Sequence, residues 1–250
     1  MARPPGPSEF RYRLVRLGVK AIVEAYVGAT AEGAENLPPS GGYIICFNHP
    51  SWMDPGFLTA AWPDRERRLF IFGPREQDMS TGIRNRFITW TGKGVPFKPD
   101  SQDVMDVTRR STALLKAGAC LAVAGEGRLS DHEGEILPLE TGLAHFALLA
   151  SVPIVPTAII GSRWVHFQSG VRIVIGSAVD PGDFARGRAG ARAMTDVVAE
   201  RLTSLLAGVE DRDPPGWFGR NFSEAFNDRP WLDEIDEMDD DDGNGQSDQA

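Results

Sequence analysis

The stretch of this 250-residue chain that decides its fold is Tyr43-Ile44-Ile45-Cys46-Phe47-Asn48-His49-Pro50-Ser51-Trp52-Met53-Asp54-Pro55. Its first five residues are apolar and predict a buried strand. Asp54 and Pro55 predict the start of a helix, with Asp54 as the N-cap and Pro55 as the first helical residue. A strand, a short polar turn and a helix in this order are typical of an α/β sheet, whose strand-end turns often carry functional groups.

His49 lies in this turn, five residues before Asp54. A carboxylate near a histidine can hold one ring nitrogen and leave the other as a base. The same residues admit a plainer interpretation, in which Asp54 only caps the helix and His49 is an ordinary turn histidine. Other parts of the chain must therefore distinguish a catalytic pair from a structural one.

Strands and helices are predicted to alternate along the rest of the chain. Further strands are expected at 68–72, 95–97, 119–124, 154–160 and 171–175, and further helices at 80–90, 101–116, 142–150 and 189–206. This alternation predicts a single α/β domain with a mostly parallel central sheet flanked by helices.

The sequence divides into five segments. We expect a disordered leader at 1–8, an N-terminal helix at 9–32, the main domain at 33–210, an aromatic amphipathic tail at 211–238 that packs on the body, and an acidic disordered end at 239–250. The helical pattern is clearest over residues 9–28, where Arg16, Lys20 and Glu24 form one polar stripe beside a wide apolar face. Such a helix can lie in a membrane interface or pack on the protein's own core, and the pattern alone slightly favours the core.

Charge and composition exclude some classes of function. The formal net charge is -9, but residues 231–250 carry nine acids and no Lys or Arg, so the rest of the chain is neutral and we expect no nucleic-acid binding. Both cysteines, Cys46 and Cys120, lie in apolar runs and are expected to be buried free thiols. The longest run of low charge, 142–161, contains two prolines and is better explained as a buried helix and strand than as a membrane span.

The turn at His49 resembles the first motif, Asn-His-x-Ser-x-x-Asp, of the glycerolipid acyltransferases, the family of lysophosphatidate acyltransferases and their relatives. Asn48, His49, Ser51 and Asp54 all match it. Three further stretches resemble later motifs of the family in the right order: Gly94–Pro99, Gly125–Ser130 and Val152–Pro156. The resemblance covers about residues 33–178. It implies a glycerol-3-phosphate acyltransferase-like fold, an acyltransferase domain at 33–210, His49 as the general base and Asp54 as the residue that orients it.

Two of the later motifs depart from the family pattern. The second normally ends in Arg, and here Lys98 and Pro99 stand at that end. The third is typically Pro-Glu-Gly-Thr-Arg-Ser. This chain has Arg128 at the Thr position and Leu129 at the Arg position. The resemblance implies that the following residues bind substrate: Asn48, Ser51, Lys98, Glu126, Gly127 and Arg128.

Plainer roles stand beside these assignments. Glu126 can form a structural salt bridge, Arg128 can be a solvated loop charge, and Val152–Pro156 can be a core strand. Glu126 and Gly127 follow a predicted buried strand, so we expect them at the same edge of the sheet as His49. Backbone amides in the turns at His49 and Gly127 are candidate donors to a developing oxyanion.

The resemblance implies transfer of a fatty acyl group to the hydroxyl of a lysophospholipid, with 1-acylglycerol-3-phosphate as the expected acceptor. The expected partners are acyl-CoA or acyl-carrier protein as co-substrate, the lysophospholipid and a membrane surface, and neither a metal nor a resident cofactor is expected. We expect a cytoplasmic protein bound peripherally to the inner face of the cell membrane. The alternatives are an acyltransferase or thioesterase acting on a lipid without phosphate, and a non-catalytic lipid-binding relative.

Overall fold

The computed structural model describes residues 9–73, 94–95 and 101–227, with the backbone alone at 9–12, 101–103, 222 and 225–227. The predictions for the leader, the helix at 80–90, Lys98 and the acidic end lie outside the described residues.

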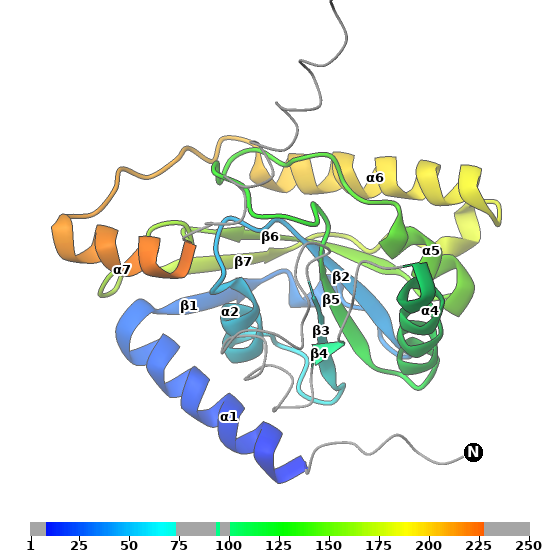
Figure 1. The fold of residues 1–250 in the computed structure, drawn as a ribbon, viewed down its shortest axis with the longest axis horizontal. Helices are drawn as coiled ribbons and strands as arrows, with labels where there is room; N and C mark the ends of the chain where they lie inside the picture. The colour runs from blue at the N-terminus through cyan, green and yellow to red at the C-terminus, as the bar shows by residue number, and fades with distance from the viewer. Residues whose placement is uncertain (1–8, 74–93, 96–100, 228–250) are drawn as a thin grey trace, which may run out of the picture.

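A seven-stranded sheet forms the centre of the molecule (Figure 1). The strands are β1 (Ala29–Glu32), β2 (Tyr43–Phe47), β3 (Leu69–Phe72), β4 (Gly94–Val95), β5 (Cys120–Ala124), β6 (Ile154–Ile160) and β7 (Val171–Ile175). They lie in the order β1-β7-β6-β2-β5-β3-β4, and every pair is parallel except β6 with β7. The predicted mostly parallel α/β sheet is therefore confirmed. Because β2 to β6 run in one direction, their carboxyl ends meet at one edge.

Helices cover both faces of the sheet. They are α1 (Glu9–Ile22), α2 (Asp54–Ala61), α4 (Ser101–Lys116), α5 (Gly142–Ala150), α6 (Arg188–Leu206) and α7 (Trp217–Asn227). Short helical turns occur at Val23–Val27, Ala34–Asn36 and Pro181–Asp183. Within the described part of the chain, no helix is both long and apolar enough to cross a membrane.

The five apolar residues of β2 are buried on both faces of the sheet. Ile44 and Cys46 pack into the layer of α4, α5 and α6, whereas Tyr43, Ile45 and Phe47 pack into the layer that includes α2 and the end of the N-terminal helix. Successive side chains of a strand point to opposite faces, so a strand buried on both faces must be apolar throughout. The central strand is therefore fixed by both layers at once.

Most predicted elements are confirmed, with ends shifted by at most one residue where the chain is described. The exception is the N-terminal helix predicted at 9–32. The helical path ends at Val27, Gly28 adopts a left-handed φ of 75°, and Ala29–Glu32 form β1 beside β7. The backbone amide of Gly28 bonds the carbonyl of Val23, and a glycine takes this conformation without the strain that a Cβ would cause.

The helix start at Asp54 also differs from the prediction. Met53 is the N-cap and makes no side-chain cap bond, while Asp54 is the first helical residue. The carboxylate of Asp54 points back into the turn and bonds His49, so it is unavailable to cap the helix. The predicted capping role is wrong, and the turn itself uses this acid.

The tail after α6 packs only partly as predicted. The α7 helix docks through Ser223, which is buried and bonds the backbone of Val165 at 2.9 Å. Trp217 and Phe218, however, are 80% and 67% exposed. The aromatic residues at the start of α7 therefore do not pack on the body.

Candidate active site

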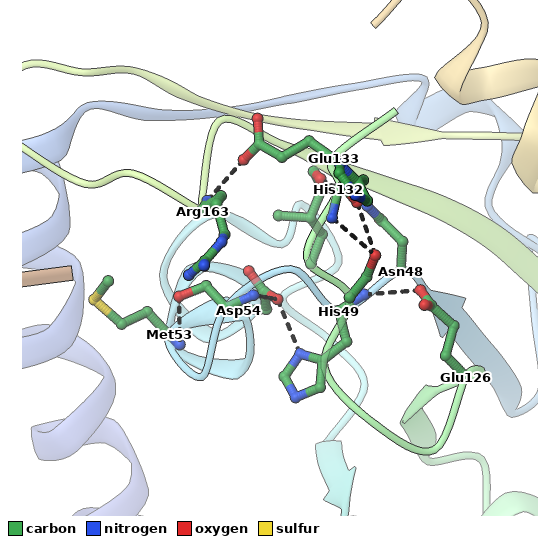
Figure 2. A network of polar contacts seen from close by, with 11 residues as sticks. Asn48, His49, Met53, Asp54, Glu126, His132, Glu133 and Arg163 are labelled. Atoms are coloured by element: carbon green, nitrogen blue, oxygen red, sulfur yellow. Dashed lines mark hydrogen bonds and ion pairs between the residues drawn. The ribbon is translucent and has the colours of Figure 1, made fainter. Parts of the chain in front are cut away.

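Loops from three parallel strands meet at the carboxyl edge of the sheet (Figure 2). The loop after β2 brings Asn48, His49 and Asp54, and the loop after β5 brings Glu126 and Glu133. The segment after β6 brings Arg163. The expectation that Glu126 shares an edge with His49 is confirmed by a direct hydrogen bond between them. The polar residues cluster because parallel strands deliver their following loops to one place.

Asn48 fastens the turn to the neighbouring strand. Its side-chain amide donates to the carbonyl oxygen of Ile159 at 3.0 Å and accepts from the amide of Ile159 at 2.7 Å. The residue is fully buried, so both polar ends of its side chain are used within the fold. The Asn48 side chain therefore positions the turn, and its expected contact with substrate stays a prediction.

His49 and Asp54 form the pair that the sequence predicts. Nδ1 of His49 lies 2.9 Å from Oδ2 of Asp54, and the same carboxylate oxygen accepts the amide of Ser51 at 2.9 Å. The His49 side chain is 6% exposed and that of Asp54 is fully buried. Two hydrogen bonds to one buried oxygen hold the carboxylate in place beside the ring.

The geometry makes the far nitrogen of His49 the reactive one. An ionised carboxylate only accepts hydrogen bonds, so the proton lies on Nδ1 and Nε2 keeps its lone pair. Figure 2 shows the second ring nitrogen on the side of the ring away from Asp54. The rings of Phe47 and Trp52 lie 5.6 Å and 6.0 Å from the imidazole, both edge-on, and limit its rotation. The turn therefore presents an oriented base.

Ser51 shapes the turn. It is fully buried, its hydroxyl accepts the amide of Met53 at 3.2 Å, and its carbonyl accepts the amide of Asp54 at 3.0 Å. A serine hydroxyl that bonds the backbone two residues ahead is a common turn-forming arrangement. Ser51 is placed to orient Asp54, and its expected contact with substrate stays a prediction.

Glu126 holds the backbone of His49. Its Oε1 accepts the His49 amide at 3.1 Å, and its Oε2 accepts the Leu137 amide at 3.1 Å. Burial raises the pKa of this carboxyl, and the two backbone amides act in the opposite direction. From the same loop, the amide of Ser130 donates to the His49 carbonyl at 2.9 Å. Both backbone groups of His49 are thus bound by the loop after β5, which is a positioning role for Glu126.

In the loop of the third motif, Gly125–Ser130, the arginine is exposed and the leucine is buried. Gly127 has a φ of 71°, a left-handed conformation that favours glycine. Arg128 is exposed and makes no hydrogen bond or ion pair with another described residue. Leu129 is 7% exposed and belongs to the core. The residue at the family's arginine position thus faces the interior, and Arg128 is the cation that the loop presents to solvent.

Two of the amides in the turns expected to form an oxyanion hole are occupied. The His49 amide donates to Glu126, and the Gly127 amide donates to the carbonyl of Ala124 at 3.2 Å. Neither is free to bind a substrate oxygen in this arrangement. A donor role for the other amides of these turns stays a prediction.

A polar group that the sequence interpretation overlooked supports the same loop. Glu133 is buried, its Oε1 accepts the Arg163 amide at 2.7 Å, and its own amide donates to Asp211 at 2.7 Å. Asp211 also lies 2.6 Å from Nδ1 of the exposed His132, which raises the pKa of His132. Burial raises the pKa of Glu133 as well. The run Asp131-His132-Glu133 suggests a solvated loop, and no local signal marks Glu133 as buried.

Cys46 lies beneath the site and is poorly suited to covalent catalysis. Burial raises the pKa of its thiol to about 12, so it stays protonated near neutral pH. A Cβ at Gly125 would lie 2.6 Å from the sulfur of Cys46, which explains why glycine follows β5 directly. The expectation that both cysteines are buried free thiols is confirmed.

Comparisons with known proteins agree with this geometry. A protein-family model described as Acyltransferase matches residues 28–160. A 1-acyl-sn-glycerol-3-phosphate acyltransferase of Bacillus subtilis (strain 168) is 24% identical over 201 residues, which cover 78% of this chain and 96% of that protein.

Mammalian proteins are also similar to the chain over part of their length. The 1-acyl-sn-glycerol-3-phosphate acyltransferase alpha of Ovis aries is 30% identical over 155 residues, 58% of this chain. The chain covers about half of its length, 48%. Among solved structures, the 1-acyl-sn-glycerophosphate (LPA) acyltransferase PlsC of Thermotoga maritima superposes with a TM-score of 0.56 at 21% identity, covering 79% of this chain and 82% of that one. This last likeness is one of fold.

Proposed function

Because the chain belongs to the acyltransferase family, we propose that it transfers a fatty acyl group from a thioester donor to the free hydroxyl of 1-acylglycerol-3-phosphate. The observation that carries the proposal is the buried hydrogen bond of 2.9 Å between His49 and Asp54, which leaves Nε2 of His49 as a base. The acceptor is supported by relatives named as acyltransferases of this lipid, at 24% to 30% identity.

In the proposed reaction His49 removes the proton of the acceptor hydroxyl. The oxygen attacks the thioester carbonyl, a C–O bond forms, the C–S bond breaks, and the leaving thiolate takes the proton from the imidazolium. Asp54 stabilises the imidazolium through Nδ1. Base assistance of this kind contributes roughly 10²–10⁴-fold to the rate. Donor and acceptor react directly, so the protonated Cys46 has no part in the reaction.

We propose that the acceptor phosphate binds cations other than the arginines of the family's second and third motifs, which this chain lacks at those positions. Arg128 is exposed at the edge that carries His49, and Lys98, outside the described residues, stands at the end of the second motif. An arginine can bind phosphate through two hydrogen bonds, whereas a lysine acts as a point charge. We therefore assign Arg128 the larger share of phosphate binding.

We also propose that the enzyme works at the inner face of the cell membrane, from the cytoplasm, without spanning it. The α1 helix supports this because Leu14, Leu17 and Ile22 are 57%, 66% and 69% exposed. Residues 9–28 contain four basic and two acidic side chains. An apolar helix face with net positive charge is the pattern of helices that lie in an anionic membrane interface.

One assay tests the proposed reaction. Purified protein is given labelled acyl-CoA or acyl-carrier protein together with lysophosphatidate, and the lipid products are separated by chromatography. Monoacylglycerol serves as the matched acceptor without phosphate. Acylated lysophosphatidate is expected, and little product from monoacylglycerol. Release of free fatty acid alone would indicate a thioesterase, and acylation of monoacylglycerol at equal rates would refute the phosphate assignment.

A further inference from the structure

Two exposed apolar surfaces lie far apart on the fold. We call the first the aromatic patch: it consists of Phe167, Trp217 and Phe218, which are 61%, 80% and 67% exposed. We call the second the α4–α5 groove, whose apolar lining includes Val104, Met105 and Leu149. In Figure 1, α7 lies at the β1 side of the sheet, and α4 and α5 lie at the opposite side. Large exposed apolar groups in such numbers commonly mark an interaction surface.

The aromatic patch is built on a fixed base. The hydroxyl of Ser223 accepts the Val165 amide at 2.9 Å and donates to the Val165 carbonyl at 3.3 Å, which ties α7 to the loop after β6. A Cβ at Gly219 would lie 2.8 Å from Pro215 and 3.4 Å from His166, so glycine there lets α7 lie close to this loop. Trp217 and Phe218 are thus exposed on an anchored helix.

The same loop joins the patch to the end of the N-terminal helix. The Gln168 amide donates to the Tyr26 carbonyl at 2.6 Å, and the Gly170 amide donates to the Val27 carbonyl at 2.9 Å. The ring of Phe167 packs edge-on against Tyr26, with 5.9 Å between centroids. The aromatic patch is therefore continuous with the helix whose exposed face carries Leu14, Leu17 and Ile22.

This combined surface adjoins α2, the helix that begins at the catalytic turn. Arg16 of α1 donates to the carbonyl of Trp62 at the end of α2, with 3.5 Å between the atoms, and α1 packs along α2. The first residue of α2 is Asp54, the partner of His49. A lipid surface against α1 would therefore lie beside α2, whose first residue is the acid of the catalytic pair.

From these contacts we propose that the aromatic patch inserts into a lipid surface, and that together with α1 it forms one membrane-binding face that sets the orientation of the catalytic turn. The inference rests on the proposed function for its choice of lipid as occupant. Tryptophan and other aromatic side chains favour the membrane–water interface, and basic α1 favours anionic headgroups. The α4–α5 groove, by contrast, has no aromatic side chain in its lining, which combines apolar residues with two threonines, Arg109 and Lys116.

Vesicle flotation compares the two surfaces. The variant W217S/F218S removes the α7 side chains of the patch, and M105S/L149S removes two apolar side chains of the groove that are 69% and 54% exposed. The vesicles contain phosphatidylcholine with phosphatidylglycerol. The patch variant removes two large apolar side chains from the contact with lipid, so it should bind at least roughly tenfold more weakly. The groove variant should bind like the wild type.

A second measurement keeps the test valid if the patch variant is unstable. Vesicles containing brominated lipid quench tryptophan fluorescence on contact, and W217F should lose a large part of that quenching while keeping wild-type flotation. If W217F is quenched as strongly as the wild type, Trp217 does not enter the lipid and the proposal is overturned. A groove variant that floats poorly while the patch variant floats normally would also overturn it.

Flotation also separates this inference from the proposed reaction. H49A should float like the wild type, because binding needs no turnover. Patch-dependent flotation of a protein that acylates no lysolipid would support the membrane face and refute the proposed reaction. Full activity on membrane-borne acceptor, with no flotation and no quenching, would support the proposed reaction and refute the membrane-binding face.

Discussion

A buried polar cluster lies at each end of β2, and the two clusters have different roles. At its start, the hydroxyl of Tyr43 donates to Asp64 at 2.9 Å and accepts from Nε1 of Trp62 at 2.9 Å. Arg67 adds a bond of 2.7 Å to the same oxygen of Asp64. Burial raises the pKa of Tyr43, while burial of Asp64 is outweighed by its bonds with Arg67, so the pKa of Asp64 is lowered. Each polar group in this cluster has a hydrogen-bond partner within the cluster.

At the carboxyl end of the same strand, the polar groups do not all satisfy each other. His49 uses Nδ1 on Asp54 and leaves Nε2 facing away (Figure 2). Oδ1 of Asp54 is buried without a hydrogen-bond partner among the described residues. Unpaired buried polar atoms are costly, so they persist where function requires them. The comparison teaches that a saturated cluster holds the fold, whereas a cluster with an unused group can act on a substrate.

The distinction between the two clusters would fail if His49→Ala and Tyr43→Phe had similar effects on turnover and stability. His49→Ala should lower kcat on the order of 10²–10⁴-fold because it removes the base, with little change in melting temperature. Tyr43→Phe should cost about 1–3 kcal/mol of unfolding free energy, because the buried Trp62 N–H loses its acceptor, while kcat of the folded protein persists. Steady-state kinetics and denaturant unfolding measure both. Wild-type turnover in His49→Ala would refute the assignment.

A finer test within the active end is Asp54→Asn. The amide keeps an oxygen for the Ser51 amide but no longer stabilises an imidazolium. We expect kcat to fall roughly tenfold to a thousandfold with the acceptor Michaelis constant little changed. Since Asp54 does not cap α2, the melting temperature should change only slightly. A variant that mainly unfolds would show that this acid serves the fold, like Asp64.

Neighbouring residues of the third-motif loop allow a matched pair of substitutions. Arg128→Ala should raise the Michaelis constant for lysophosphatidate about tenfold to a hundredfold, since a lost charge-assisted contact costs about 1.5–3 kcal/mol. Leu129→Ala should instead lower the unfolding free energy by about 2–5 kcal/mol through the cavity left in the core. Unchanged acceptor kinetics in both Arg128→Ala and Lys98→Ala would refute a phosphate role for these cations.

The smallest expected effect concerns pH and the contact of His132 with Asp211. The pKa of His132 is raised above 6.5 by this carboxylate, so its stabilising contribution is complete below that value and is lost as pH rises through the raised pKa. His132→Gln should remove this slope from the unfolding free energy just above pH 6.5. Parallel pH curves for wild type and variant, measured by denaturant titration, would show that the contact contributes nothing.

Local patterns predict the elements and the contact between His49 and Asp54 well. The buried strands, α4, α5 and α6 follow from runs and periods that tertiary contacts only reinforce. The spacing of His49 and Asp54 places both in one turn, where they can meet without help from distant residues. Strand β1 was missed because four residues, Ala29–Glu32, give too short an alternation, and pairing with β7 decides their conformation.

By itself, therefore, the sequence determined an α/β sheet and the pairing of His49 with Asp54, because these depend on neighbours within a few residues. Only the tertiary structure decided that Asn48 bonds Ile159, that Glu126 holds the His49 backbone, and that Leu129 is interior while Arg128 is exposed. These contacts depend on the order of the strands and on which loops meet at the carboxyl edge of the sheet. Partners 77 and 111 residues apart leave no periodic signal, because only the folded sheet brings them within hydrogen-bond distance.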